Sequence, residues 1–218
     1  MKVKILLPLL LLIMFFSTGC QKEQDSPETA LNEIRIALNK RDLTKLSERV
    51  DVDKFFSVTY DDATKEITEH YFEYKAKYPE DPYFQHDVEF IEKYNIKNKT
   101  EHLWFAEKVK YAYLARAAEP DQPQENPAAY VANELEKISK ASEITIRGTR
   151  IEGDEATLIV DIQDSNDFYK DIIGDMTFKL HFTRGEDKLW HFEKIENMDE
   201  LMPIFVDKAE MLWINNPE

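Results

Sequence analysis

The spacing of the apolar residues changes once along this chain, near residue 141, and this change constrains the fold more than any other feature. Before it, apolar residues recur every three or four positions, which is typical of amphipathic α-helices. After it, apolar and polar residues alternate, as in β-strands that bury one face. Helices followed by consecutive strands predict an α+β fold, in which N-terminal helices pack on one face of a four-stranded antiparallel sheet.

Helix start signals divide the first part of the chain. Ser26, Pro27 and Glu28 combine a capping hydroxyl, a proline suited to the first turn and an acid near the positive end of the helix. Asp42 is expected to cap a short second helix that turns Leu43, Leu46 and Val50 inward. A third helix is expected to begin a few residues later, at one of the next two aspartates.

Two separate helices are expected in the second half of the helical region. In the first, Phe84 and Ile91 lie at helical spacing, with Asn95 next in the series, and the second covers residues 100–118. The many aromatic residues between positions 71 and 94 also follow helical spacing. Ordinary core is therefore the favoured interpretation of this cluster, and a ligand groove or protein interface is the alternative.

Three prolines among polar residues mark a boundary. Residues 119–127 contain no apolar side chain to bury, so they predict a linker. It separates a helical region, residues 26–118, from a second region, residues 128–218, that begins with a helix and continues into the strands. The two regions are expected to form one globular unit, because about 195 residues suit one domain.

The alternating part predicts four strands in an antiparallel meander. Gly148 is expected to form a β-bulge in the first strand, because the apolar parity changes after it. Across the last hairpin, a shared buried face requires Leu180 to face Trp190 and Phe178 to face Phe192, with an odd number of residues in the connection. The residues expected on the buried face of the second and third strands are Ala156, Leu158, Val160, Ile162, Met176, Phe178, Leu180 and Phe182.

The four-strand stretch and its ending carry a family resemblance. A Gly-Asp turn at Gly153 precedes an apolar alternating strand, and the last strand holds Trp190 and Phe192, followed by Ile195 and Asn197. This part resembles the cystatin-like superfamily, whose best-known branch is the nuclear-transport-factor-like fold. The resemblance implies a curved sheet that wraps a helix into a cone, whose mouth holds a small ligand or a catalytic acid and base. A C-terminal helix is expected to close the fold through Leu201, Phe205, Ala209 and Leu212.

The first twenty residues have the order of a secretory signal. Two lysines precede an apolar run, which ends in small residues and is too short to span a bilayer. Thr18, Gly19 and Cys20 resemble the lipobox of bacterial lipoproteins. The resemblance implies that residues 1–19 are a signal peptide cleaved after Gly19 and that Cys20 carries the lipid. An unlipidated secreted protein with a free cysteine is the alternative.

Lipid attachment would place the protein in the cell envelope, on the extracytoplasmic side of a membrane. Residues 20–25 would then be the lipidated cysteine and its tether, whose last five residues reach under about 18 Å. Gln21 is not the aspartate associated with inner-membrane retention in enteric bacteria, so an outer membrane is compatible with the sequence.

The charge balance excludes one class of partner. Removing residues 1–19 takes away two lysines and no acid, so the 28 basic residues become 26 against 43 acidic ones, and the formal charge changes from −15 to −17. Nucleic acid binding requires clustered basic residues, and the sequence has no basic stripe. Anionic lipid would not attract such a chain either, so the acyl chains are the expected contact with the membrane.

The residue types that carry chemistry form no complete catalytic, metal or cofactor pattern. No histidine lies in a metalloprotease, deaminase or zinc-ribbon spacing, and neither a glycine-rich phosphate loop nor a nucleophile elbow is present, so no catalytic residue and no cofactor is assigned. Glu66 and His70 lie four residues apart, and His70 and Glu73 lie three apart; a surface ion pair is the favoured interpretation, and a metal-binding pair is the alternative. His181 and His191 are expected on the solvent face of the sheet.

Three functions are compatible with these features. The favoured one is a non-enzymatic module that binds a protein partner or a small apolar ligand. The second is an enzyme of the cone-shaped fold with a buried carboxylate base, Asp161 or Asp175, which requires an enclosed acid with a raised pKa. The third is an immunity-type or structural protein that acts through its acidic surface. The apolar connection at residues 164–175 is expected to plug a satellite core, with a lid as the alternative.

Overall fold

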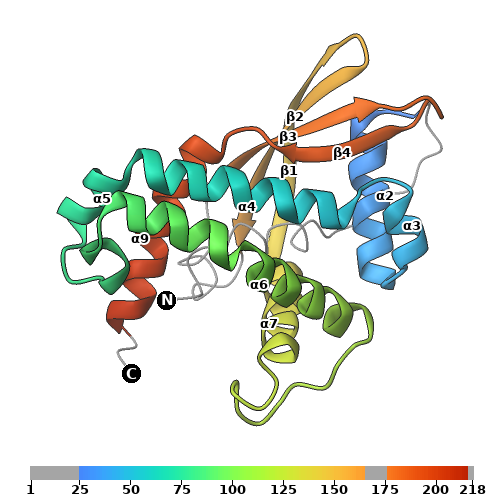
Figure 1. Cartoon of the computed structure of the whole chain (residues 1–218). Helices are drawn as coiled ribbons and strands as arrows, with labels where there is room; N and C mark the ends of the chain where they lie inside the picture. Colours follow the sequence, from blue (N-terminus) through green and yellow to red (C-terminus); the bar gives the residue numbers. More distant parts are fainter. Residues whose placement is uncertain (1–24, 165–175, 216–218) are drawn as a thin grey trace.

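The computed structural model describes residues 25–164 and 176–215 of the chain. It shows helices followed by an antiparallel sheet and a final helix, which confirms the expected α+β class (Figure 1). The predictions for the signal peptide, for Gly19 and Cys20, and for most of the connection 164–175 lie outside the described residues. In chain order, the elements are α2 (Pro27–Lys40), α3 (Leu43–Ser47), α4 (Val52–Glu69), α5 (Tyr71–Lys77), the 3-10 helix η2 (Pro82–Gln85), α6 (Val88–Leu114), α7 (Pro127–Ala141), β1 (Ser142–Glu152), β2 (Glu155–Asp164), β3 (Met176–Arg184), β4 (Trp190–Ile195) and α9 (Met198–Asn215).

Local capping chemistry sets the starts of the helices. The Ser26 hydroxyl accepts a hydrogen bond from the backbone N–H of Thr29, 3.1 Å away, at the start of α2. Asp42 caps α3 and Asp51 caps α4 in the same way, each at 3.0 Å. These contacts satisfy backbone donors that have no partner within the helix, and they confirm the expected helix starts. Leu46 and Val50 are buried as expected, whereas Leu43 is 40% exposed, so its expected inward orientation is wrong.

The structure joins the two helices expected around residues 84–118. Helix α6 runs unbroken for 27 residues, and Phe84 lies before it in η2. The apolar pattern fails in the middle because the inward position is taken by polar Asn95, which is 4% exposed, whereas the next residue, Ile96, is 78% exposed. The helix continues through this point because polar contacts replace apolar ones there.

The sheet is a meander with strand order β1-β2-β3-β4. The register of β1 on β2 shifts between Ile146 and Gly148, which confirms the expected bulge, and Gly153 forms the following turn with a φ of 67°. All eight residues expected on the buried face of β2 and β3 are buried. One face of the sheet therefore forms one side of the hydrophobic core.

The pairing of β3 with β4 differs from the expected register. Phe182, not Phe178, faces Phe192, and Arg184 faces Trp190. Residues 185–189 close a compact turn, in which the Gly185 N–H donates to the carbonyl of residue 189 at 2.9 Å. The connection between the strands is therefore shorter than predicted, and their pairing extends to Arg184 and Trp190. The connection has an odd number of residues, as expected, and the same side chains remain buried.

Helices α2 and α4 cover the buried face of the sheet. The Phe55 ring of α4 lies 5.1 Å from the ring of Phe192, which lies 5.4 Å from that of Phe182. Helix α9 packs against α4 and buries Leu201 and Phe205, as expected for a closing helix. The helices thus cover one face, whereas the cone-like curvature of the cystatin-like resemblance stays a prediction.

The segment between α6 and α7 contains turns and bends but no helix or strand at residues 117–126. Pro127, the last residue of the expected linker, is the first residue of α7, and Asn126 caps that helix. Buried residues from both sides of this segment belong to one hydrophobic cluster. Helix α7 also packs directly on α6.

Candidate functional site

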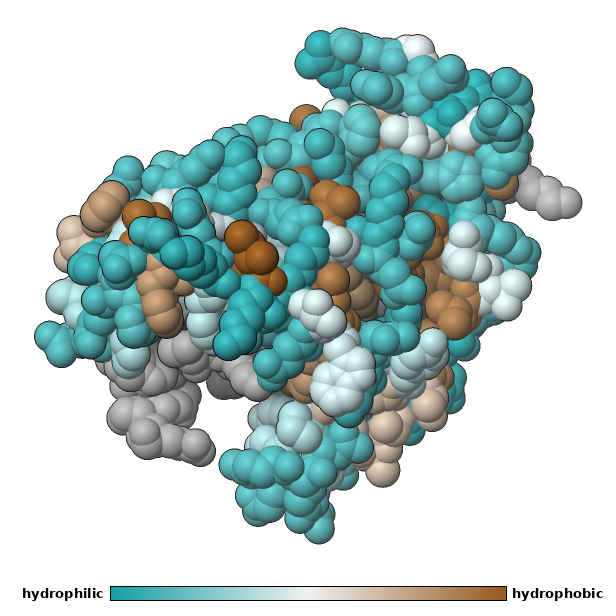
Figure 2. Space-filling view, viewed as in Figure 1, coloured by the Kyte–Doolittle hydropathy of each residue, from teal (hydrophilic) through white to brown (hydrophobic). Residues whose placement is uncertain are grey.

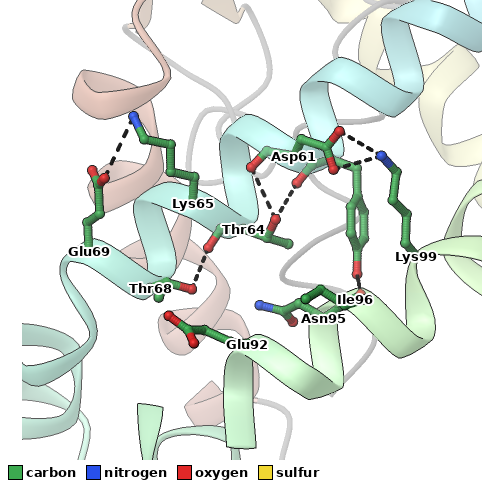
Figure 3. A pocket seen from close by; sticks show the side chains of 10 residues that line it. Asp61, Thr64, Lys65, Thr68, Glu69, Glu92, Asn95, Ile96 and Lys99 are labelled. Carbon is green, nitrogen blue, oxygen red and sulfur yellow. Dashed lines mark hydrogen bonds and ion pairs between the residues drawn. The ribbon is translucent and has the colours of Figure 1, made fainter. Parts of the chain in front are cut away.

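A groove with a volume of about 450 Å³ lies between α4 and α6 (Figure 3). Both helices contribute side chains, and most of these are polar or charged. On the face of the molecule shown in Figure 2, hydrophilic residues predominate and hydrophobic ones form small, separate groups. The residues that line the groove are Tyr60, Asp61, Thr64, Lys65, Thr68, Glu69, Glu92, Asn95, Ile96 and Lys99.

A buried polar network fixes the wall of the groove. The Tyr60 hydroxyl on α4 donates to the backbone carbonyl of Asn95 at 2.8 Å, and the Nδ1 atom of His102 lies 3.2 Å from the same hydroxyl. The Tyr83 hydroxyl donates to the Asn95 side-chain oxygen at 3.0 Å. Burial raises the pKa of both tyrosines well above the ordinary value, so these hydroxyls keep their protons at neutral pH.

The side-chain nitrogen of Asn95 has no hydrogen-bond partner among the residues that the structure describes. Asn95 is 4% exposed, yet it lines the groove, and Figure 3 shows its nitrogen directed into the space between the helices. A buried donor without a partner costs about 1–3 kcal/mol. This nitrogen has almost no exposed surface, so a ligand in the groove would have to approach it closely to supply the missing hydrogen bond.

Charged residues at the edge of the groove are paired, with one exception. Lys99 of α6 contacts Asp61 of α4 at 2.6 Å, and Lys65 lies 3.7 Å from Glu69 on α4. Glu92 on α6 has no ion pair or hydrogen bond within the described part of the chain. The groove therefore carries one unneutralised negative charge.

Two threonines of α4 present oxygen atoms to the groove. The Thr64 hydroxyl donates to the backbone carbonyl of Tyr60 at 2.9 Å, and the Thr68 hydroxyl donates to that of Thr64 at 2.8 Å. Because both protons are used within α4, the hydroxyl oxygens remain acceptors. Opposite them, Ile96 offers an exposed apolar side chain. The groove thus combines one free donor, two acceptors, an apolar contact and a negative charge.

Asp161, one of the two expected catalytic carboxylates, has different surroundings from those a general base requires. It lies on the sheet face opposite the core, 2.5 Å from the Arg147 Nε atom and 2.8 Å from the Thr177 hydroxyl. The Arg147 hydrogen bond lowers the pKa of Asp161, whereas the hypothesis requires a raised one. The expectation is therefore wrong for Asp161. Asp175, the other candidate, lies outside the described residues.

The histidines of the sheet pair with carboxylates. His181 lies 2.8 Å from Glu196, and His191 lies 3.0 Å from Asp187, both on the face away from the core, as expected. On the helices, the His70 Nε2 atom lies 3.9 Å from Glu66, so the two side chains are close as expected, but Glu66 is buried, 8% exposed, and not on the surface. No group of three or more His, Cys, Asp or Glu residues in the described ranges could hold a metal ion.

The aromatic cluster between positions 71 and 94 forms core, with exceptions at its edge. Tyr71, Tyr83 and Phe84 are buried, which confirms the favoured interpretation for them, whereas Phe72 is 72% exposed and Phe90 is 44% exposed. Tyr83 also belongs to the network beside the groove. None of the aromatic residues between positions 71 and 94, all of which the structure describes, lines the groove, so the alternative interpretation, a ligand groove or protein interface, stays a prediction.

Sequence reasoning did not find the groove, although one signal was present. Asn95 continues the apolar series of α6, and a polar amide at an inward position requires hydrogen-bond partners. Its partners, Tyr60 and Tyr83, lie 35 and 12 residues away in the sequence. No local pattern identifies them.

Comparisons of the chain with protein-family models, with curated proteins and with solved structures gave no match. Within the described residues, no helix is both long enough and apolar enough to cross a membrane.

Proposed function

We propose that this chain is an envelope lipoprotein, held at a membrane by acyl chains on Cys20, and that its folded part is a non-enzymatic binding module. The groove between α4 and α6 is its ligand site. The observation that carries the proposal is the Asn95 side-chain nitrogen, which is buried, has no partner among the described residues and points into the groove.

The environment of Asn95 favours binding. An unpaired buried donor destabilises the folded protein, and a ligand that supplies an acceptor removes this destabilisation when it binds. The neighbouring tyrosines hold the amide in place, because one donates to its side-chain oxygen and the other to its backbone carbonyl. A pre-oriented donor loses little conformational freedom when the ligand binds.

The start of the folded part is consistent with a short tether. Asp25 accepts a hydrogen bond from the backbone N–H of Trp190 at 2.8 Å and pairs with Arg49 at 2.6 Å, so the chain is attached to β4 from residue 25 onward. If Cys20 is lipidated, the five residues that follow it keep the folded body within about 18 Å of the bilayer surface.

The anchor is tested by intact-mass measurement of the full-length protein purified from native membranes. We expect a chain that begins at Cys20 and carries acyl groups, and we expect the Cys20→Ser variant to lose both the acyl mass and the membrane association. Material that retains Met1, or an unmodified residue 20, would contradict the anchor.

The binding site is tested by native mass spectrometry of the same purified protein. We expect a co-purifying ligand, which Ile96→Trp displaces because the larger side chain fills the groove from an exposed position. Lys97→Trp is the matched control, since this exposed neighbour on α6 does not line the groove. A ligand that both variants retain equally would place the binding site elsewhere.

A further inference from the structure

We infer that the groove between α4 and α6 binds a peptide segment with a basic side chain, whose backbone carbonyl accepts a hydrogen bond from Asn95 and whose cationic group pairs with Glu92. This inference rests on the proposed binding function and specifies its ligand. Its basis is the arrangement of one donor, two acceptors, one apolar side chain and one unpaired carboxylate in a single groove.

The Asn95 nitrogen selects an acceptor. Tyr83 already occupies the side-chain oxygen, so the group that faces the groove is a donor only. Carbonyl, hydroxyl and carboxylate oxygens would all satisfy it. The uncompensated charge of Glu92 disfavours the carboxylate, because like charges close together repel. A neutral carbonyl oxygen is the acceptor that fits both residues.

The charge of the groove selects a cation. Asp61 and Glu69 have lysine neighbours at 2.6 and 3.7 Å, whereas Glu92 has no partner in the described part of the chain. Glu92 and Asn95 lie three residues apart on α6 and therefore on the same side of the helix, with Cβ atoms about 5–6 Å apart. A ligand at Asn95 thus lies within reach of the free carboxylate.

The helical spacing of Glu92 and Asn95 suits a long basic side chain. A lysine has a flexible stem of four carbons between its backbone and its ammonium group. The stem can lie on Ile96, which is 78% exposed beside Asn95, and the contact between their apolar surfaces favours binding. A carbonyl at Asn95, a stem on Ile96 and an ammonium at Glu92 together match the backbone and side chain of one residue.

The opposite wall complements a peptide backbone. The hydroxyl oxygens of Thr64 and Thr68 are acceptors, because their protons are donated to carbonyls of α4. Backbone N–H groups of a bound peptide would find these oxygens across the groove from the Asn95 donor. A simple diamine offers the cation but no carbonyl for Asn95, and for this reason we favour a peptide.

Titration calorimetry on the full mature protein tests the inference with three probes. The first is acetyl-Gly-Lys-Gly-amide, the second is the same peptide with norleucine in place of lysine, and the third is 1,5-diaminopentane. We expect the lysine peptide to bind more tightly than the norleucine peptide by about threefold to fivefold, which corresponds to a partly exposed ion pair. The diamine is expected to bind more weakly than the lysine peptide, because it leaves Asn95 unpaired.

Glu92→Gln removes the charge at an exposed position and leaves the core intact. This variant should bind the lysine and norleucine peptides equally well. Glu107→Gln is the matched control, since Glu107 is also exposed on α6 but does not line the groove, and it should keep the wild-type preference. Equal binding of the two peptides by the wild type, or the same loss of preference in both variants, would overturn the inference.

The side-chain amide signals of Asn95 in nuclear magnetic resonance spectra give a second measurement that needs no variant. We expect them to shift when the lysine peptide is added. If the envelope-derived ligand shifts them and the lysine peptide does not, the groove binds another class of ligand and only this inference fails. If neither shifts them, the proposed binding function of the groove fails as well.

Discussion

Replacing Arg49 with methionine tests how the start of the folded chain is attached to the sheet. The Arg49 side chain is 5% exposed and makes three contacts: with Asp25 at 2.6 Å, with Glu33 at 2.6 Å and with the backbone carbonyl of Trp190 at 3.1 Å. Methionine keeps most of the apolar stem but removes the charge and all the donors. The variant therefore isolates the polar contacts.

The expected loss follows from the exposure of each partner. The Glu33 side chain is 49% exposed, so its ion pair contributes little. The contact with Asp25, whose side chain is 18% exposed, and the contact with the Trp190 carbonyl are largely shielded from water. Losing two such contacts and leaving a carboxylate without its partner should lower the free energy of unfolding by about 3 kcal/mol.

Urea unfolding followed by tryptophan fluorescence measures this loss. We expect a lower midpoint for Arg49→Met with an unchanged dependence on urea, because the surface exposed on unfolding stays the same. Arg150→Met is the control, since that side chain is 77% exposed and pairs with Glu152 on the same strand, and its cost should be under about 0.5 kcal/mol. A loss under about 1 kcal/mol for Arg49→Met, or equal losses for both variants, would refute the reasoning.

Three further predictions concern single groups. Tyr60→Phe removes the hydroxyl that donates to the Asn95 carbonyl, so we expect urea unfolding to show a loss of about 1–3 kcal/mol, and an unchanged midpoint would contradict this. Burial raises the pKa of Asp62, so its charged form is penalised in the folded state. Asp62→Asn should therefore be more stable than the wild type at pH 7. The stability advantage of Asp62→Asn should shrink as the pH falls through the raised pKa of Asp62 in the folded state, and it should vanish below the unfolded pKa of about 3.9. Thermal unfolding of both proteins across this pH range measures the trend. An advantage that grows as the pH falls would contradict the prediction. Gly153→Ala should lower the free energy of unfolding by about 1 kcal/mol, because the residue has a φ of 67°, although an added Cβ meets no atom. Gly148→Ala is the control, since that position is equally open but has no positive φ, and it should lower the stability less. Equal losses of stability in thermal or urea unfolding would show that the backbone conformation of Gly153 is not the cause.

The elements that the sequence predicts correctly depend on neighbouring residues. The caps at Ser26, Asp42 and Asn126 each involve a side chain and a backbone N–H three residues later, so the pattern and the contact lie in the same short segment. The turn at Gly153 and the bulge at Gly148 are also indicated by residues within the same short segment. Local chemistry is sufficient for these features.

The features that the sequence does not predict depend on distant partners. Helix α6 continues past Asn95 because Tyr60 and Tyr83 supply hydrogen bonds that no helical periodicity reveals. The register of β3 on β4 depends on how tightly residues 185–189 close, and several registers bury the same residues. The groove requires both the separation of α4 from α6 and the orientation of one amide. Apolar spacing specifies neither of these.

The pairing of charges distinguishes the groove from the acidic surface as a recognition site. On the outer face of the sheet, Asp161 pairs with Arg147 at 2.5 Å, and Lys179 pairs with Glu200 at 2.5 Å. A basic partner that docked there would have to displace these internal cations, so much of the attraction would be lost. Glu92 pairs with no cation in the described part of the chain, so a basic ligand would have none to displace. A single free carboxylate beside an unpaired donor therefore gives a more selective site for a basic ligand than the large net negative charge does.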